Sequence, residues 1–157
     1  MALAISVFAL LATFYQLYLQ RAHNEKSLKP LPQIDFFDRG KVIYIHVQNN
    51  GVGPLIIESL SFTRNGEAYS DIEACLDLCP RSYMHMQITS SSKKVVLPGE
   101  FLEVFSTRFG DYAGEVEMNN VRRQLASLHL MATGRDIYDN EIVVEREFDW
   151  FCRHQQE

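Results

Sequence analysis

The sequence predicts a mainly β protein in which a single N-terminal transmembrane helix precedes an antiparallel, immunoglobulin-like β-sandwich with one or two short helices. Three observations lead to this class. The first twenty residues are apolar and carry no charged side chain. Several later segments alternate apolar and polar residues with a period of two, as half-buried strands do. Turn signals built from Gly, Pro and Asn separate these segments at the short intervals typical of a sandwich.

The N-terminal segment, residues 1–20, has the length of a membrane span. At 1.5 Å per residue it forms a helix of about 30 Å, which matches the hydrocarbon core of a bilayer. A cleaved signal peptide is one alternative, but it calls for a basic start and a small-residue cleavage site. A type IV pilin stalk would continue as a long helix, whereas Pro30 and Pro32 end this one early. A buried helix of a soluble protein is the third alternative. We expect an uncleaved anchor whose partner is the lipid bilayer.

The charges that flank the apolar segment predict its orientation. Arg21, Lys26 and Lys29 follow the segment, and only the α-amino group precedes it. Because excess Lys and Arg stay in the cytoplasm, we expect a single-pass protein of the inner (cytoplasmic) membrane with its soluble domain in the cytoplasm. The three cysteines show no framework spacing and no N-x-[ST] sequon occurs, which agrees with a domain that stays inside.

One face of this helix carries small and polar residues. They recur at spacings of four and three, which places them in a stripe along the helix: Ala2, Ser6, Ala9, Thr13, Gln16 and Gln20. Small side chains let two helices approach closely, and Gln16 can hydrogen-bond across the pair. The stripe predicts that the helix associates with a second copy of the chain or with a membrane protein partner. The alternative is that alanine is simply common in such segments, since Ala4 and Ala12 lie off the stripe.

Three further parts are expected after the helix. The chain is polar and punctuated by proline from Arg21 onward, and alternating segments then continue almost to the C-terminus. The expected parts are a juxtamembrane linker at 21–33, the β-sandwich domain at 34–152 and a tail at 153–157. The domain should contain about seven to nine strands, of which the clearest are at 41–49, 55–62, 82–90, 93–97, 100–107, 125–133 and 141–151. A short helix is expected at 71–79, and 114–124 has moderate helical character.

The motif Asn49-Asn50-Gly51-Val52-Gly53-Pro54 connects two of these strands. The Asn50-Gly51 pair adopts positive φ at little cost, Gly53 permits another tight turn, and Pro54 fixes the entry into the next strand. We therefore predict a structural turn made by Asn50, Gly51, Gly53 and Pro54. Further turns are predicted at Arg64-Asn65-Gly66-Glu67 and at Pro98-Gly99.

The composition and the motifs give no clear signal for nucleic-acid binding, catalysis or metal binding. A formal net charge of -5 is unlike that of a nucleic-acid-binding domain, so no nucleic acid partner is expected. The basic pairs Lys93-Lys94 and Arg122-Arg123 are interpreted as solvated faces. No histidine spacing, nucleophile motif or phosphate loop of a known enzyme type occurs. Cys75, Cys79 and His85 would need a fourth ligand to form a zinc site. The sequence predicts no catalytic residues, no metal and no cofactor, and we expect that the protein is not an enzyme.

Several turn and linker motifs form a recognisable set: His23-Asn24, Ser27, Lys29-Pro30, the 49–54 motif, Pro98-Gly99-Glu100 and Asp136-Ile137-Tyr138. This set resembles uncharacterised small bacterial single-pass membrane proteins with a C-terminal immunoglobulin-like β-sandwich. The resemblance covers most of the chain and implies one N-terminal helix ahead of the sandwich. Asp139-Asn140 departs from the glycine expected in that hairpin. These motifs are specific for architecture and name no activity.

Two classes of function fit these observations. The first is a membrane-anchored, non-enzymatic binding module whose sandwich recognises a protein or small ligand, as a sensor or effector subunit that assembles through its transmembrane helix. The second is an extracytoplasmic envelope module, or an accessory subunit of a membrane enzyme complex, held by the same helix. We expect the first class, because the flanking charges place the domain in the cytoplasm.

Overall fold

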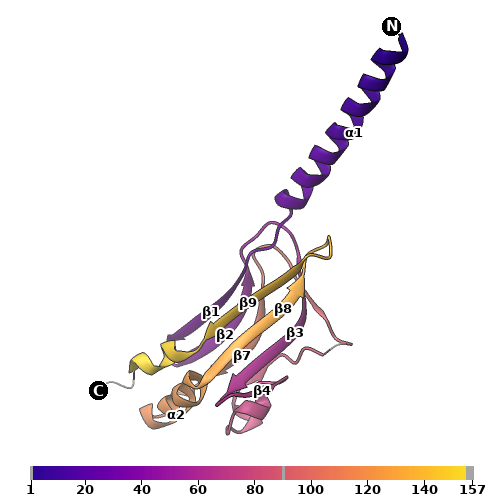
Figure 1. Cartoon of the computed structure of the whole chain (residues 1–157). Coiled ribbons are helices and arrows are strands. Elements are labelled where there is room, and N and C mark those ends of the chain that lie inside the picture. The colour runs from indigo at the N-terminus through magenta and orange to yellow at the C-terminus, as the bar shows by residue number, and fades with distance from the viewer. Residues whose placement is uncertain (1, 90, 155–157) are drawn as a thin grey trace.

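The computed structural model describes residues 2–89 and 91–154 (Figure 1). The chain begins with α1, Ala2–Ser27, and contains a second α-helix, α2, Glu115–Ala126. Three short 3-10 helices are η1, Glu73–Cys75, η2, Pro80–Ser82, and η3, Asp149–His154. The strands are β1 Pro32–Arg39, β2 Val42–Asn49, β3 Leu55–Arg64, β4 Glu67–Tyr69, β5 Met84–His85, β6 Lys94–Val96, β7 Phe101–Arg108, β8 Leu128–Arg135 and β9 Glu141–Glu147.

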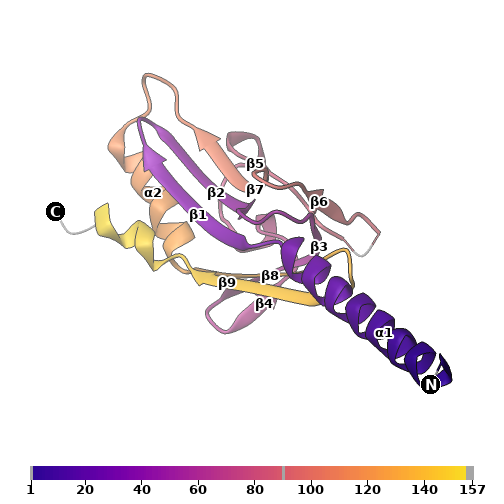
Figure 2. The same cartoon turned by 90° about the horizontal axis from the view of Figure 1, so that it is seen from above.

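The strands form two antiparallel sheets that pack face to face (Figure 2). The first sheet has the strand order β1-β2-β7-β5. The second has five strands in the order β4-β3-β8-β9, with β6 also paired to β3. The chain forms the β1-β2 hairpin in the first sheet and then crosses to the second sheet at β3. α1 projects from one end of this sandwich, and α2 lies at the other end (Figures 1 and 2).

Period-two alternation explains why each long strand buries one face. In β2, Ile43, Ile45 and Val47 point into the core and are at most 1% exposed, while the residues between them face outward. Burial of each such side chain contributes roughly 1.5–3 kcal/mol. β3, β7 and β8 bury apolar side chains in the same way, so the core lies between the two sheets. The two-layer antiparallel core expected from the alternation is present.

The chain between β4 and β7 is less regular than predicted. The helix expected at 71–79 is reduced to η1, and the strand expected at 82–90 is reduced to the two residues of β5. Pro80 lacks a backbone N–H and cannot continue a helix from the residues before it. Ile72, Cys75 and Tyr83 are nevertheless buried. The segment therefore packs as an irregular layer along the edge of the first sheet.

α2 forms where the sequence was ambiguous. Met118, Val121 and Leu125 recur at spacings of three and four and bury one face of the helix. Glu115 and Glu117 lie in the first turn, where carboxylates complement the helix dipole. The helix packs against η3 and closes the end of the sandwich that lies away from α1.

The membrane predictions are wrong. Among residues 2–89 and 91–154, no helix combines the length and the apolar character that a membrane crossing requires. α1 is long enough, but Gln16 and Gln20 interrupt its apolar part, and charged residues begin at Arg21 inside the same helix. The fold class is a mixed α/β chain with a two-sheet antiparallel core and an N-terminal helix. The predicted transmembrane helix and the predicted single-pass location in the inner membrane are therefore not supported, and neither is the cytoplasmic orientation that depended on them.

The N-terminal helix also ends later than the predicted segment at 1–20. It continues to Ser27, so the linker expected at 21–33 begins inside the helix. Arg21 and Glu25 form an ion pair one turn apart, with 3.1 Å between Nε and Oε1, which supports these added turns. Pro30 and Pro32 then start the extended chain of β1. At the other terminus, η3 includes 153–154 of the expected tail, and 155–157 lie outside the described residues.

Candidate functional site

The predicted turn at Asn50, Gly51, Gly53 and Pro54 joins β2 of the first sheet to β3 of the second. Neither of its glycines has positive φ, so the expected backbone reason for them is wrong. Space is the actual reason. A β-carbon on Gly51 would lie 2.4 Å from the Leu31 nitrogen, and one on Gly53 would lie 1.7 Å from the Leu28 carbonyl oxygen. The motif therefore packs closely against residues 28–31, the chain that leaves α1, and we call this contact the seat of α1.

Asn49 holds this seat together. The backbone N–H of Asn50 donates to the Leu31 carbonyl at 2.9 Å, and the N–H of Leu31 donates to Asn49 Oδ1 at 3.2 Å. Asn49 is fully buried, so these hydrogen bonds satisfy its polar side-chain atoms. These contacts are structural, and the motif lies outside the hollows described below.

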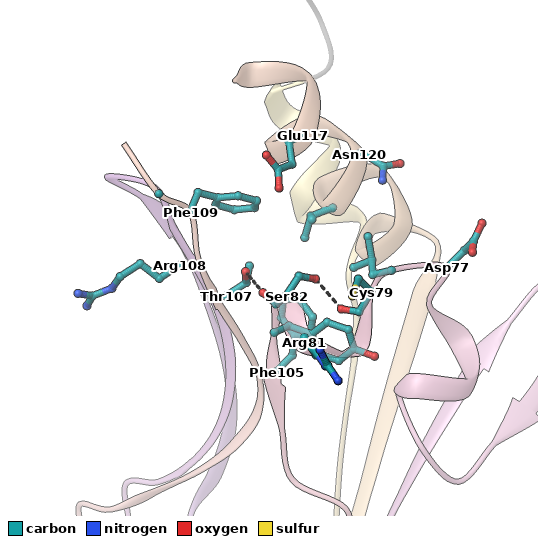
Figure 3. Close-up of a pocket in the computed structure, with 14 residues that line it drawn as sticks. Asp77, Cys79, Arg81, Ser82, Phe105, Thr107, Arg108, Phe109, Glu117 and Asn120 are labelled. Carbon is teal, nitrogen blue, oxygen red and sulfur yellow. Dashed lines mark hydrogen bonds between the residues drawn. The ribbon is translucent and has the colours of Figure 1, made fainter. Parts of the chain in front are cut away.

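A hollow next to the core lies between β7, the irregular segment 77–83 and α2 (Figure 3). Its volume is about 410 Å³, within the range of small-molecule sites. Phe105 and Val121 are buried and form its apolar floor. Three segments far apart in the sequence therefore build one concave surface.

The walls of the hollow differ in charge. Figure 3 shows the Glu117 carboxylate and the Phe109 ring reaching into the gap, whereas the Arg108 guanidinium points away from it. Glu117 is exposed, and its carboxylate pairs with no described side chain. The nearby hydroxyls are already occupied: Thr107 donates to the Ser82 carbonyl at 2.7 Å, and Ser82 donates to the Cys79 carbonyl at 2.7 Å. Arg81 also lines the hollow and is exposed, so the hollow presents an anion at Glu117 and a cation at Arg81.

Two contacts fix α2 as a wall of the hollow. Arg122 donates from Nε and Nη2 to the two carboxylate oxygens of Asp38 on β1, both at 2.8 Å. The Asp38 carboxylate raises the pKa of Arg122. Gln124 exchanges two hydrogen bonds with the backbone of Asp77, at 2.7 and 3.0 Å. The interpretation of Arg122-Arg123 as a solvated face is thus wrong for Arg122, whose side chain is 11% exposed.

A second hollow of about 580 Å³ lies on the outer face of the first sheet, beside a column of rings. Phe37, Tyr44, His46 and Phe101 stack in sequence, with centroid separations of 4.7, 4.0 and 4.0 Å. Burial lowers the pKa of His46, and Glu103 and Asp35 only partly oppose that effect. His46 is therefore a neutral ring in the stack near neutral pH.

A third feature groups Asp71, Glu73 and His85. The imidazole of His85 lies beside both carboxylates, not beside the two cysteines that were considered with it for zinc. Cys75 is buried, and its burial raises the thiol pKa to about 11. Burial also raises the pKa of Tyr83, with added contributions from the Glu73 and Asp71 carboxylates. The Tyr83 ring also lies next to the imidazole of this group, with 5.6 Å between the ring centroids of Tyr83 and His85.

The predicted association face lies on α1, far from these hollows (Figure 1). The structure places Ser6, Ala9, Thr13, Gln16 and Gln20 on exposed helix, and the side chain of Ala2 lies outside its described part. The Thr13 hydroxyl donates to the Ala9 carbonyl at 2.9 Å, which leaves its methyl group for contact. Large apolar side chains cover the other sides of the helix, each 48–74% exposed: Ile5, Val7, Phe8, Leu10, Leu11, Phe14, Tyr15, Leu17, Tyr18 and Leu19.

Sequence reasoning did not identify Glu117, Phe109 or the Asp71-Glu73-His85 group. Their partners come from segments that are distant or irregular, so no spacing in the sequence signals them. No protein-family model matches the chain, and no curated protein matches its sequence. The resemblance to small bacterial proteins described above stays a prediction.

Proposed function

We propose that this chain is a non-enzymatic binding module whose ligand enters the hollow between β7, segment 77–83 and α2. The observation that carries the proposal is a concave surface of about 410 Å³ with an apolar floor and an unpaired carboxylate. Binding sites of this size combine an apolar lining with a few placed polar groups. Both walls are held by hydrogen bonds, so the surface is formed before a ligand arrives.

The part of the hollow next to Glu117 and Phe109, on the α2 side, favours a cationic group of the ligand. The Glu117 carboxylate attracts an amine or guanidinium, and the Phe109 ring beside it can contact the same cation through its face (Figure 3). The apolar floor at Phe105 and Val121 suits an aliphatic chain attached to that cation. A lysine or arginine side chain of a partner protein has this composition, as does a small aliphatic amine.

Three probes of equal length separate charge from hydrophobic contact. Pentylamine, pentanol and pentanoate are titrated into the ¹⁵N-labelled full chain, and amide shifts are followed by NMR. We expect pentylamine to shift amides around the hollow at lower concentration than the other two probes. Glu117→Gln should remove that preference, whereas Glu141→Gln, an exposed carboxylate on β9, should keep it. Equal response to the three probes, or shifts confined to other surfaces, would refute the proposal.

A second candidate function belongs to α1. We propose that α1 associates with α1 of a second copy along Ser6, Ala9 and Thr13. The support is that large apolar side chains lie beside this stripe and are exposed in the single chain, so that helices that meet at the stripe would cover them. Contiguous apolar surface of this kind marks an interaction site. The stretch from Ala2 to Gln20 carries no charge, so two copies approach without repulsion.

Sedimentation velocity of the purified full chain tests this association. The wild-type chain should self-associate, and a variant with Ala9→Leu and Thr13→Leu should associate more weakly because bulk on the stripe keeps the helices apart. A variant with Ala4→Leu and Ala12→Leu is the control, because these alanines lie off the stripe. A monomeric wild-type chain, or equal association of both variants, contradicts the proposed face.

A further inference from the structure

The cluster of Asp71, Glu73 and His85 has the chemistry of a metal site. His85 Nε2 lies 3.5 Å from Glu73 Oε2 and 3.6 Å from Asp71 Oδ1. The three potential ligand atoms all lie within 4.8 Å of one another. We propose that these three residues bind a divalent transition-metal ion, with zinc as the best match. This inference is independent of the ligand proposed for the hollow.

The two separations between His85 and the carboxylates fit a small tetrahedral ion. Zinc binds imidazole nitrogen and carboxylate oxygen at about 2.0–2.2 Å, so neighbouring ligand atoms of a tetrahedron lie roughly 3.3–3.6 Å apart. Both separations that involve His85 fall in this range. Calcium and magnesium prefer oxygen ligands alone, so the imidazole selects against them. Three protein ligands leave the fourth position open to a water or another ligand.

The backbone holds two of the three ligands in place. Asp71 Oδ1 accepts the backbone N–H of Glu73 at 3.1 Å, which sets the carboxylate at the start of η1. His85 belongs to β5 and is paired with Phe105 of β7. The Asp71 and His85 side chains are 17% and 20% exposed, whereas Glu73 is 46% exposed. Glu73 is thus free to adjust its position around an ion that the other two residues receive.

An independent observation beside the cluster also points to a ligand. The Tyr83 hydroxyl has no hydrogen-bond partner among the described residues, although only 7% of the residue is exposed. Tyr83 has extended backbone and precedes His85 by two positions, so the two side chains share one face. Their ring centroids are 5.6 Å apart. A buried phenol normally has a partner, and a water or ligand on a bound ion would accept from this hydroxyl.

Calorimetric titration of the full chain with Zn²⁺ tests the proposal. Cys79 and Cys152 are exposed thiols and are first replaced by serine, because free thiols also bind zinc. We expect one ion per chain. His85→Ala and Glu73→Gln should each weaken Kd by about tenfold or more, the loss that even an outer-shell partner produces. His129→Ala is the matched control, since His129 also lies beside a carboxylate, Glu145, at 3.8 Å.

Two further measurements keep the test decisive. Glu73 is half-exposed, so Glu73→Gln can be made without loss of packing. It tests zinc binding even if His85→Ala does not fold.

Titration with Co²⁺ in place of Zn²⁺ tests the coordination geometry of the bound ion, because the visible absorption of Co²⁺ is strongest in tetrahedral sites. His85→Ala should remove this absorption. Glu117→Gln should bind zinc with unchanged affinity, which separates this site from the hollow. No zinc binding in the serine background, or equal affinity in Glu73→Gln and its parent, overturns the proposal.

Discussion

The side-chain amide of Asn49 donates to the backbone carbonyl of Gly53 across 2.8 Å, and this contact folds the connection between β2 and β3 back on itself. The same nitrogen donates to the Val96 carbonyl at 3.1 Å, which joins the connection to β6. The side-chain oxygen accepts the N–H groups of Leu31 and Gly51 at 3.2 and 3.1 Å. One buried side chain therefore links the exit of α1, the 49–54 motif and the second sheet.

Replacing Asn49 by leucine should destabilise the fold by about 3 kcal/mol or more. Leucine has a similar volume, but it would remove four hydrogen bonds to backbone groups, three of them buried. A buried backbone group that loses its partner costs about 1–3 kcal/mol when water cannot reach it. Urea unfolding followed by circular dichroism measures the change. Asn50→Ala is the control, because Asn50 is exposed and makes one side-chain bond, to Gln33 at 3.2 Å. Similar losses in both variants would show that burial of the Asn49 amide is not the cause.

Gly53→Ala should disturb the seat of α1 without changing any hydrogen-bonding group. The added β-carbon would lie 1.7 Å from the Leu28 carbonyl oxygen, so the backbone must move apart. Overpacking of this kind costs about 1–3 kcal/mol. We also expect faster amide hydrogen exchange at Leu31 and Asn50, whose bonds depend on the close approach.

Gly110→Ala is the matched control for this substitution. Gly110 has no positive φ, and a β-carbon there would meet nothing within 4 Å. Its stability and its exchange rates should stay near those of the wild-type chain. If Gly53→Ala exchanges no faster than Gly110→Ala, the close approach is not what holds the exit of α1.

The 49–54 motif shows which features cannot be predicted from neighbouring residues in the sequence. Alternation in the sequence located β2, because the period of two depends only on neighbouring residues. The turns at Asn65-Gly66 and Gly99 have the positive φ that their sequence predicts. Gly51 and Gly53 do not, because their need for glycine comes from the chain at 28–31, and no local pattern records that contact.

The candidate sites lie beyond these rules for the same reason. Arg122 and Asp38 are 84 positions apart, so a basic pair on an amphipathic segment looked like a solvated face. The hollow joins β7, an irregular segment and α2, and only the packed fold brings them together. His85 was considered with the nearby cysteines, because the irregular backbone that turns it toward Asp71 and Glu73 has no periodic signal. The apolar start of α1 has the length of a membrane span, but length alone does not show that the glutamines within it lower its apolar character below what a crossing requires.

Arg122→Ala should destabilise the protein by about 3–5 kcal/mol, whereas Arg123→Ala should change little. Removal of Arg122 takes the bidentate partner from the Asp38 carboxylate, which is only 2% exposed, and breaking a buried ion pair on one side is costly. Arg123 is exposed and bonds to Asn120 within its own helix. Thermal and urea unfolding of the two variants compare neighbouring residues of one type. Equal stability of the two variants would mean that the Asp38 pair contributes nothing net. Arg122→Lys should recover only part of the loss, because an ammonium cannot make both bonds.

Asp136 should contribute to stability at neutral pH and lose that contribution in acid. It is buried and accepts the N–H groups of Tyr138 and Asn140 and the Asn140 side chain, at 2.8, 3.0 and 2.8 Å. Burial alone would raise the pKa of Asp136, but these bonds outweigh it and hold the pKa below the ordinary value of 3.8. Because the folded pKa is the lower one, the stabilisation is present above pH 3.8 and disappears as the pH falls through the folded value. The wild-type chain should therefore have a larger free energy of unfolding than Asp136→Asn at about pH 6, and this difference should shrink toward about pH 2.

Asp139→Asn, which changes an exposed carboxylate of the same turn, should show a much smaller pH-dependent difference. A difference for Asp136→Asn that stays constant from neutral pH to acid would rule out the carboxylate as its source.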